Sequence, residues 1–271
     1  MAQFVGRTHP GTRTGPNQDA MGWQDSAQLA FVADGMGGYA SGEVASDLVK
    51  RTLLDCADAA DLPGAVMKAH AQIVAAAESH AEYAGMGSTV VAVQIGHRTA
   101  TVVWVGDSRA YLWRRGTLQP LTRDHSVGEV LREAENLSET QLRRHPLRHK
   151  VIQSLGKDEP VPSVGETPLR RGDWILLCSD GLSGELRDNE IADLLGSQAS
   201  LDSAADALVN GALTKGGSDN ITVVLVEYVG PSAVDFGFLR NERVVLWLSI
   251  LGGMLLAVTV AGLGWWISRR K

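Results

Sequence analysis

The sequence predicts a mixed α+β domain followed by one membrane-spanning helix. Apolar runs of strand length recur between residues 28 and 228, and pairs of amphipathic helical stretches separate them. An uncharged apolar run follows at residues 244–267. We therefore divide the chain into a domain at residues 1–228, a linker at 229–243, the span at 244–267 and a basic tail at 268–271.

The first half of the domain combines strands with a pair of helices. Residues 28–33 form an apolar run that ends at a glycine-rich turn, which predicts a buried strand. Two stretches with apolar residues at helical spacing follow, and then two apolar runs joined by a Gly-His-Arg turn. The predicted helices are 43–60 and 65–81, and the predicted strands after them are 88–95 and 99–105.

The second half repeats this combination around a polar, charged stretch at residues 122–150. Short apolar runs predict strands on both sides of that stretch, and two helical patterns lie between the last two strands. The predicted strands are 110–113, 118–121, 174–178 and 221–228, and the predicted helices are 188–195 and 201–214.

Composition and charge indicate a globular protein and argue against a nucleic-acid-binding one. The 271 residues include 44% hydrophobic and 21% charged side chains, which is typical of a globular domain. A net charge of −6 argues against a nucleic-acid partner, because affinity for the phosphate backbone comes from clustered Lys and Arg. The two cysteines, Cys56 and Cys178, lie in apolar patterns without metal-type spacing, so we expect buried thiols.

Five aspartates are the candidate functional residues. Four are placed after apolar strands and beside Gly, Ser or Asn, and the fifth precedes the first predicted strand. An aspartate in such a position most often caps a turn, so each of them alone has a structural explanation. If the strands converge, however, the clustered carboxylates would repel each other unless a cation lay among them. The five residues are Asp34, Asp107, Asp180 and Asp219, with Asp19 before the first strand.

An all-oxygen cluster indicates a hard divalent cation. Mg²⁺ and Mn²⁺ accept carboxylates, carbonyls and waters, whereas the HExxH and CxxC spacings of zinc sites are missing from the sequence. Two such ions about 3.5–4 Å apart lower the pKa of a shared water and hold a phosphoryl oxygen. The sequence contains neither a GxSxG nucleophile motif nor a P-loop. It therefore predicts a two-metal hydrolase.

The same residues, in this order, resemble the metal-dependent protein phosphatases of the protein phosphatase 2C-like family, in its bacterial type. The similarity covers about residues 5–228, and six segments in register make it specific although each motif alone is weak. The segments are NQDA at 17–20, VADGMGG at 32–38, GST at 87–89, VGDSR at 105–109 with LTRDHS at 121–126, CSDGL at 178–182 and GSDNIT at 217–222.

This resemblance implies a more detailed fold and an activity. The fold would be two stacked antiparallel β-sheets flanked by helix pairs, a four-layer α-β-β-α arrangement with the metal ions between the sheets at one edge. The activity would be metal-dependent hydrolysis of phosphoserine and phosphothreonine on proteins, opposing a Ser/Thr kinase. The polar stretch at 122–150 would be the family's flap beside the site.

The resemblance also implies roles for the catalytic residues. Asp34 would bridge two catalytic ions, and Gly35 would offer its backbone carbonyl to one of them. Asp180 and Asp219 would hold one ion of the pair. Asn220 would support Asp219, although a cap at the start of the following strand explains it equally well.

Three further residues complete the implied site. Asp19 would order a metal-bound water, and Asp107 would help to hold a third, weaker ion. Arg13 would bind the phosphate through the parallel hydrogen bonds of its guanidinium. Arg13 departs from the family pattern because it lies four residues before Asn17, where the expected place, three before, holds Thr14.

Two other positions depart from the family pattern. Gln18 stands where many members have glutamate. Met36 stands where animal members have a histidine proposed as the general acid, so that proton donor is missing here, as in bacterial relatives. His125 is an alternative donor by residue type alone, but the sequence favours a structural role in a turn.

Two alternatives to an active phosphatase follow from the same residues. The chain could be an inactive relative that serves as a membrane-tethered binding module, but intact Asp34, Asp180 and Asp219 argue against this. It could also be another two-metal hydrolase such as a phosphodiesterase, which the order of the motifs argues against.

The predicted membrane span has 24 residues and no charged side chain. As a helix it would be about 36 Å long, enough for a hydrocarbon core of about 30 Å, and Trp residues stand near both ends. A buried core helix is the alternative, but core helices of this length usually contain a charge. Gly253, Ala257 and Ala261 recur every four residues and would let two such helices pair as a homodimer.

The orientation of the span is predicted from two opposing signals. The N-terminus has no apolar signal segment, so we expect a cytoplasmic catalytic domain on a single-pass anchor. The basic residues Arg269, Arg270 and Lys271 outnumber those before the span, which favours the opposite orientation. We give more weight to the first signal, because a domain of this size is not readily moved across a membrane.

Overall fold

The computed structural model describes residues 1–12, 14–37, 41–55, 61–135, 141, 145–148 and 150–230. Contacts divide the chain into two units, residues 1–230 and 231–271, and only the first lies within the described residues. Arg13, Cys56, most of the linker, the predicted span and the basic tail therefore lie outside them. Within the described part of the chain, no helix has the length and apolar character needed to cross a bilayer.

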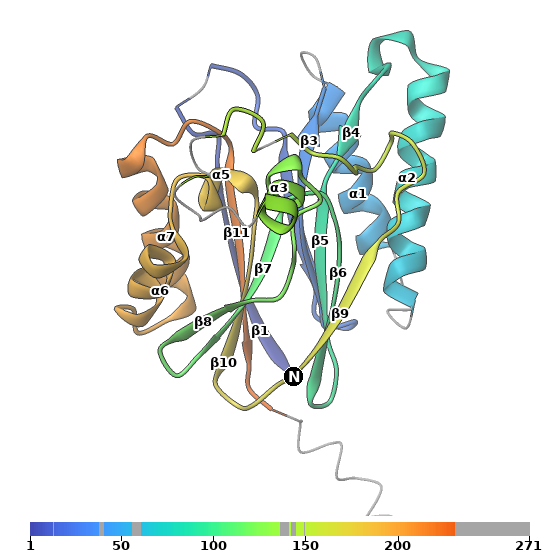
Figure 1. Cartoon of the computed structure of the whole chain (residues 1–271). Helices are drawn as coiled ribbons and strands as arrows, with labels where there is room; N and C mark the ends of the chain where they lie inside the picture. The colour runs from blue at the N-terminus through green and yellow to red at the C-terminus, as the bar shows by residue number, and fades with distance from the viewer. Residues whose placement is uncertain are drawn as a thin grey trace, which may run out of the picture. The chain divides into compact units, whose positions relative to one another are not determined.

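Two antiparallel sheets form the centre of the first unit (Figure 1). One sheet has the strand order β1-β11-β10-β7-β8. Its strands are β1 (Ala2–His9), β7 (Arg109–Arg114), β8 (Thr117–Pro120), β10 (Asp173–Cys178) and β11 (Ile221–Tyr228).

The second sheet has the order β2-β3-β5-β6-β9, and a short strand, β4, also pairs with β3. Every pairing between neighbouring strands is antiparallel. Its strands are β2 (Asp19–Gln24), β3 (Leu29–Met36), β4 (Gly87–Ser88), β5 (Val90–Ile95), β6 (Thr99–Val105) and β9 (Ser163–Pro168).

Helices cover the outer face of each sheet (Figure 1). Two helices, α1 (Ser41–Leu54) and α2 (Leu62–Ser79), lie against the second sheet, and a 3₁₀ turn, η2 (Ala81–Tyr83), follows them. On the first sheet lie α6 (Asp188–Gly196) and α7 (Leu201–Lys215). Two further helices, α3 (Val127–Glu135) and α5 (Asp180–Ser183), lie toward the end of the unit where β3 ends.

Strand periodicity explains why the sheets stack. In β11, Val223 and Leu225 face the helices α6 and α7, while Val224 and Val226 face the other sheet. Such a strand is apolar on both faces, because successive side chains point to opposite sides and both sides are covered. Three buried clusters result, one between the sheets and one under each helix pair.

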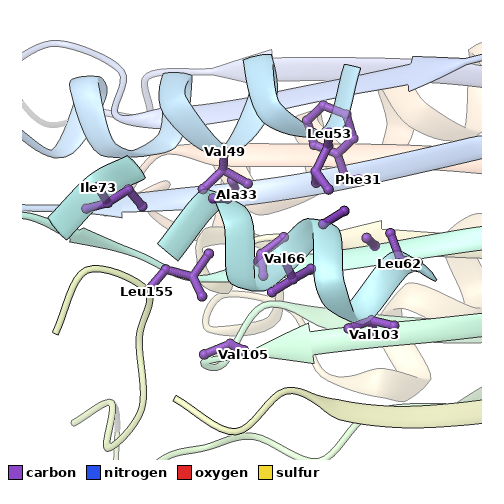
Figure 2. Close-up of a cluster of buried hydrophobic side chains, with 14 of the residues drawn as sticks. Phe31, Ala33, Val49, Leu53, Leu62, Val66, Ile73, Val103, Val105 and Leu155 are labelled. Atoms are coloured by element: carbon purple, nitrogen blue, oxygen red, sulfur yellow. The ribbon is translucent and has the colours of Figure 1, made fainter. Parts of the chain in front are cut away.

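In the core under α1 and α2, apolar side chains on one face of each helix pack against the sheet (Figure 2). Val49 and Leu53 of α1 lie four residues apart on one helix face and pack with Phe31 of β3. Val66 and Ile73 lie on the inner face of α2. All five side chains are fully buried, so the spacing that predicted the helices also places them on the sheet.

The α+β class and the two antiparallel sheets with flanking helices are confirmed. Three strands were not predicted, namely β1, β2 and β9. The predicted positions of two aspartates were also wrong in detail, because Asp34 lies within β3 and Asp219 precedes β11 instead of following a strand. Asp19 precedes the first predicted strand as expected, and it begins β2, which was not predicted.

Candidate active site

Four of the five predicted aspartates come from two pairs of neighbouring strands. Asp19 lies directly opposite Asp34 in the β2–β3 ladder. Asp180 begins α5 immediately after β10, and Asp219 stands just before β11, the neighbour of β10. Asp107 is buried in the turn between β6 and β7. The antiparallel pairings bring the start of β2 beside the end of β3, and the end of β10 beside the start of β11.

A serine connects the two sheets at this edge. The hydroxyl of Ser179, which follows β10, donates a hydrogen bond to Asp19 Oδ2 at 2.8 Å. The Ser179 hydroxyl oxygen also accepts the backbone N–H of Thr222 in β11 at 3.0 Å. Ser179 is completely buried, so this link holds Asp19 of the second sheet against the first sheet.

The five carboxyl groups interact with one another. Burial raises the pKa of Asp34 well above its usual range, and the charges of Asp19, Asp180, Asp107 and Asp219 raise this pKa further. Asp180 interacts with Asp219 on one side and shares a hydrogen bond with Asp34 on the other. The structure therefore brings all five predicted aspartates into one cluster.

Burial has the same effect on the other members of the cluster. It raises the pKa of Asp19 to about 7 and the pKa of Asp180 to about 6, and it raises the pKa of Asp107 well above its ordinary value. The nearby Arg109 does not neutralise them fully, because its guanidinium is paired with Asp124 through bonds of 2.8 and 2.6 Å. Like charges in such a site are stable only with added positive charge or protons.

Two carboxylate oxygens support a cation at this cluster. Asp19 Oδ1 and Asp180 Oδ1 are buried, and neither has a hydrogen-bond partner within the described structure. Buried polar atoms are nearly always paired, so these two atoms are suited to a ligand. Their chemistry, hard anionic oxygen, fits Mg²⁺ or Mn²⁺.

The cluster does not form a closed cage of side chains. Over the described ranges, no group of three His, Cys, Asp or Glu side chains is arranged to hold a metal ion by itself. Mg²⁺ typically binds through one or two carboxylates and keeps several waters, so pairs of aspartates supplemented by carbonyls suffice. The donor set fits such an ion and does not fit a structural zinc site.

Close packing surrounds Gly35, the residue expected to offer its carbonyl. A Cβ atom there would lie 1.9 Å from the carbonyl oxygen of Gly42 in α1 and 2.7 Å from the carbonyl oxygen of Gln18. The N–H of Gly35 donates to that Gln18 oxygen at 3.0 Å. Only glycine allows β3, α1 and the residue before Asp19 to approach so closely.

Asn220 holds the connection between β1 and β2. Its Oδ1 accepts the N–H of Gln18 at 2.8 Å, and its Nδ2 donates to the carbonyl of Pro10 at 2.9 Å. Its own N–H donates to Asp219 Oδ1 at 2.9 Å. Asn220 therefore contacts Asp219 and also clasps both ends of the connection between β1 and β2, at Pro10 and Gln18.

His125 has a structural position. Its Nδ1 accepts the N–H of Gly106 at 3.2 Å, so its Nε2 carries the proton that faces Ser163 Oγ at 3.0 Å. The imidazole is also stacked on Trp104, with ring centroids 6.2 Å apart. Both nitrogens are engaged, which supports the turn role and leaves no free donor for a leaving group.

Three hydroxyl residues at the site were not predicted from the sequence. Ser179, Thr89 and Ser108 each contact an aspartate of the cluster or the turn that carries one. Each is adjacent to a motif aspartate or lies within the GST motif, which was the available signal. Ser and Thr beside a strand end are so common in turns that residue type alone could not identify them.

The predicted flap begins beside the Asp107 turn. Its two ends are joined by an antiparallel bridge between Ser126 and Val151, and Ile152 N–H donates to the carbonyl of His125 at 2.8 Å. The helix α3 lies within this segment. Residues 136–140, 142–144 and 149 of the predicted flap are outside the described residues.

Known proteins resemble this chain in sequence and in fold. A family model described as protein phosphatase 2C matches residues 5–215. The serine/threonine phosphatase stp of Listeria welshimeri is 38% identical over 217 residues, which cover 75% of this chain and 86% of that protein. The serine/threonine protein phosphatase PstP of Mycobacterium tuberculosis is 33% identical over 99% of this chain and 52% of its own length.

Solved structures agree with the sequence matches. The crystal structure of M. tuberculosis PstP/Ppp has a TM-score of 0.78 at 33% identity and covers 83% of this chain and 98% of that chain. The catalytic domain of PstP in complex with two manganese ions has a TM-score of 0.74, also at 33% identity, over 83% of this chain and 97% of that chain. The chain therefore belongs to the protein phosphatase 2C family and is a metal-dependent serine/threonine protein phosphatase.

Proposed function

We propose that this phosphatase uses two Mg²⁺ or Mn²⁺ ions, and a third ion held more weakly, at the aspartate cluster to hydrolyse phosphoserine and phosphothreonine on proteins. The observation that carries the proposal is the convergence of five carboxylates with two buried, unpartnered oxygens, Asp19 Oδ1 and Asp180 Oδ1. The PstP catalytic domain with two manganese ions supports the number of catalytic ions.

Each residue of the cluster has a part in this proposal. Asp34, central in the cluster, would bridge the pair of ions, and Gly35 would add its backbone carbonyl. Asp180 and Asp219, which interact with each other, would hold the second ion. When bound, the ions would supply a water of lowered pKa and neutralise charge on the phosphoryl oxygens.

The chain's other groups orient the reactants. Asp19, fixed through Oδ2 by Ser179, would direct its free Oδ1 toward the attacking water. Asp107 would contribute to the weaker third ion. Arg13 would bind the phosphate, on the segment that Asn220 clasps. Met36 offers no proton, and in this proposal water protonates the leaving oxygen.

One assay tests the proposed activity. Release of phosphate from a phosphothreonine peptide is measured with and without Mn²⁺, beside a phosphodiester, for the wild type and Asp34→Asn. We expect Mn²⁺-dependent release from the peptide, little from the diester, and a loss of at least about a hundredfold in the variant. Preference for the diester would support the phosphodiesterase alternative, and no release by the wild type would support the binding module.

We also propose that the phosphatase is tethered to a membrane through residues 244–267, with its catalytic domain in the cytoplasm, opposing a Ser/Thr kinase there. The apolar length and terminal Trp residues of that segment support the tether. Protease added to inverted vesicles should digest the catalytic domain. Resistance in those vesicles would overturn the orientation.

Pairing of two such spans is part of the same proposal. Gly253, Ala257 and Ala261 would form the contact face of a homodimer. Ala257→Leu should then reduce crosslinking between copies in the membrane. An unchanged crosslinking yield would rule out this face.

A further inference from the structure

Thr89 interrupts the regular pairing of β3 beside the aspartate cluster. β3 pairs with β5 as far as Val91 and with β4 from Ser88, so Thr89 lies between the two pairings and faces Asp34. Its N–H donates to the carbonyl of Asp34 at 2.8 Å. The N–H of Asp34 is accepted by the Thr89 hydroxyl at 3.1 Å instead of by a backbone carbonyl.

The same side chain also contacts the turn that carries Asp107. The hydroxyls of Thr89 and Ser108 are 2.7 Å apart and hydrogen-bonded, and both residues are only 1% exposed. The methyl of Thr89 packs against Gly106, where a Cβ would lie 2.6 Å from Thr89 Cγ2. Gly106 has a φ of +105°, which favours glycine. Because Gly106 has no Cβ, the turn can pack directly against the Thr89 methyl. Thr89 thus touches both neighbours of Asp107 in the sequence.

We propose that Thr89, together with Ser108, is a positioning residue that fixes the Asp107 turn relative to Asp34. The Thr89 hydroxyl bonds both the backbone N–H of Asp34 and the hydroxyl of Ser108, the residue after Asp107. Because both hydroxyls are buried, water does not readily replace either bond. The pair therefore determines how the two carboxylates face a shared set of cations, an inference that rests on the metal site proposed above.

Two substitutions at Thr89 separate its hydroxyl from its methyl. Thr89→Val keeps the packing on Gly106 and loses the hydroxyl, whereas Thr89→Ser keeps the hydroxyl and loses the methyl. Mn²⁺ binding is measured by calorimetry, and kcat and KM are measured on a phosphothreonine peptide. We expect Thr89→Val to weaken Mn²⁺ binding about tenfold and to lower kcat, with Thr89→Ser within about twofold of the wild type.

Ser108→Ala removes the same hydrogen bond from the opposite side. It should weaken Mn²⁺ binding in the same direction, and adding it to Thr89→Val should produce little further loss, because the two residues share one bond. This variant also carries the test if Thr89→Val does not fold.

Thr52→Val is the matched control. Thr52 is 3% exposed and bonds Gln72 Oε1 at 2.6 Å in the contact between α1 and α2, outside the aspartate cluster. Its loss should lower thermal stability without changing Mn²⁺ binding. If Thr89→Val and Ser108→Ala also lower stability alone, with the Mn²⁺ dissociation constant of the wild type, the positioning role is wrong. If the wild type itself neither binds Mn²⁺ nor responds to it, the proposed metal site fails instead.

Discussion

Gly35 shows how tightly single residues constrain this site. The position lies next to Asp34, and its missing side chain allows β3 and α1 to approach each other. Backbone groups of three different segments meet here: Gln18 before β2, Gly35 in β3 and Gly42 in α1. The geometry of the cluster therefore depends on a residue without any side-chain chemistry.

Gly35→Ala is expected to destabilise the fold by about 3 kcal/mol or more, because the new Cβ would overlap backbone atoms that cannot rotate away. Chemical denaturation measures the loss, and phosphatase activity at saturating Mn²⁺ should fall with it. Gly165→Ala in β9 is the control, since its Cβ would meet its nearest neighbour at an ordinary 3.6 Å. Equal stability of the two variants would contradict the packing argument.

At the level of elements, burial explains most of the strands that the sequence could predict, although the exposed β8 was also predicted. The strand predicted at 99–105 matches β6, and the one at 221–228 matches β11, whose residues are nearly all buried. β1 and β9 are edge strands with alternating or partial exposure, and β9 also contains Gly165 and Pro168. Such strands lack a continuous apolar run and look like loops.

The site could be predicted to a similar degree. Its aspartates stood out through their motifs, and the structure gathers all five. The contacts that hold them could not be predicted, because Ser179 reaches Asp19 across 160 positions of the chain and Asn220 reaches Pro10 across 210. Only the sheet stacking brings such partners together, and no local pattern encodes it.

The position of the connection between β1 and β2 depends on the side chain of Asn220, in the loop before β11. Asn220→Ala would leave the N–H of Gln18 without its acceptor and free the segment that carries Arg13. We expect a stability loss of about 1–3 kcal/mol and a KM for phosphopeptide that rises more than kcat falls. Asn210→Ala, at an exposed position of α7, should change neither. A variant at Asn220 with wild-type KM and stability would show that the clasp does not hold the segment.

At the scale of the whole molecule, buried carboxyl groups repel one another in the aspartate cluster, whereas the two sheets otherwise pack through apolar side chains. The core between the sheets and the cores under both helix pairs are apolar and buried. The cluster lies at one edge of this stack, and its carboxyls are disfavoured as anions by burial and by each other. Folding stability should therefore depend on pH and on divalent cations together.

The pKa values of Asp19 and Asp180 determine the sign of this dependence. Folding raises them to about 7 and about 6, above the value of about 3.9 in an unfolded chain. Between pH 4 and 7 the unfolded chain has released protons that the folded cluster still holds, so the contribution of these groups to stability is present at low pH and is lost as the pH rises.

Mn²⁺ should reverse that loss, because it binds the ionised cluster of the folded protein and not the unfolded chain. We expect the rise in Tm on adding Mn²⁺ to be small at pH 5 and to grow by several degrees up to pH 7.5. Asp180→Asn removes one of the titrating groups and should flatten both the pH dependence without metal and the Mn²⁺ response. A Tm increment that stays constant across this range would mean that proton release from the cluster and metal binding are not linked. The carboxyls whose pKa values burial raises would then not be the groups that bind the cation.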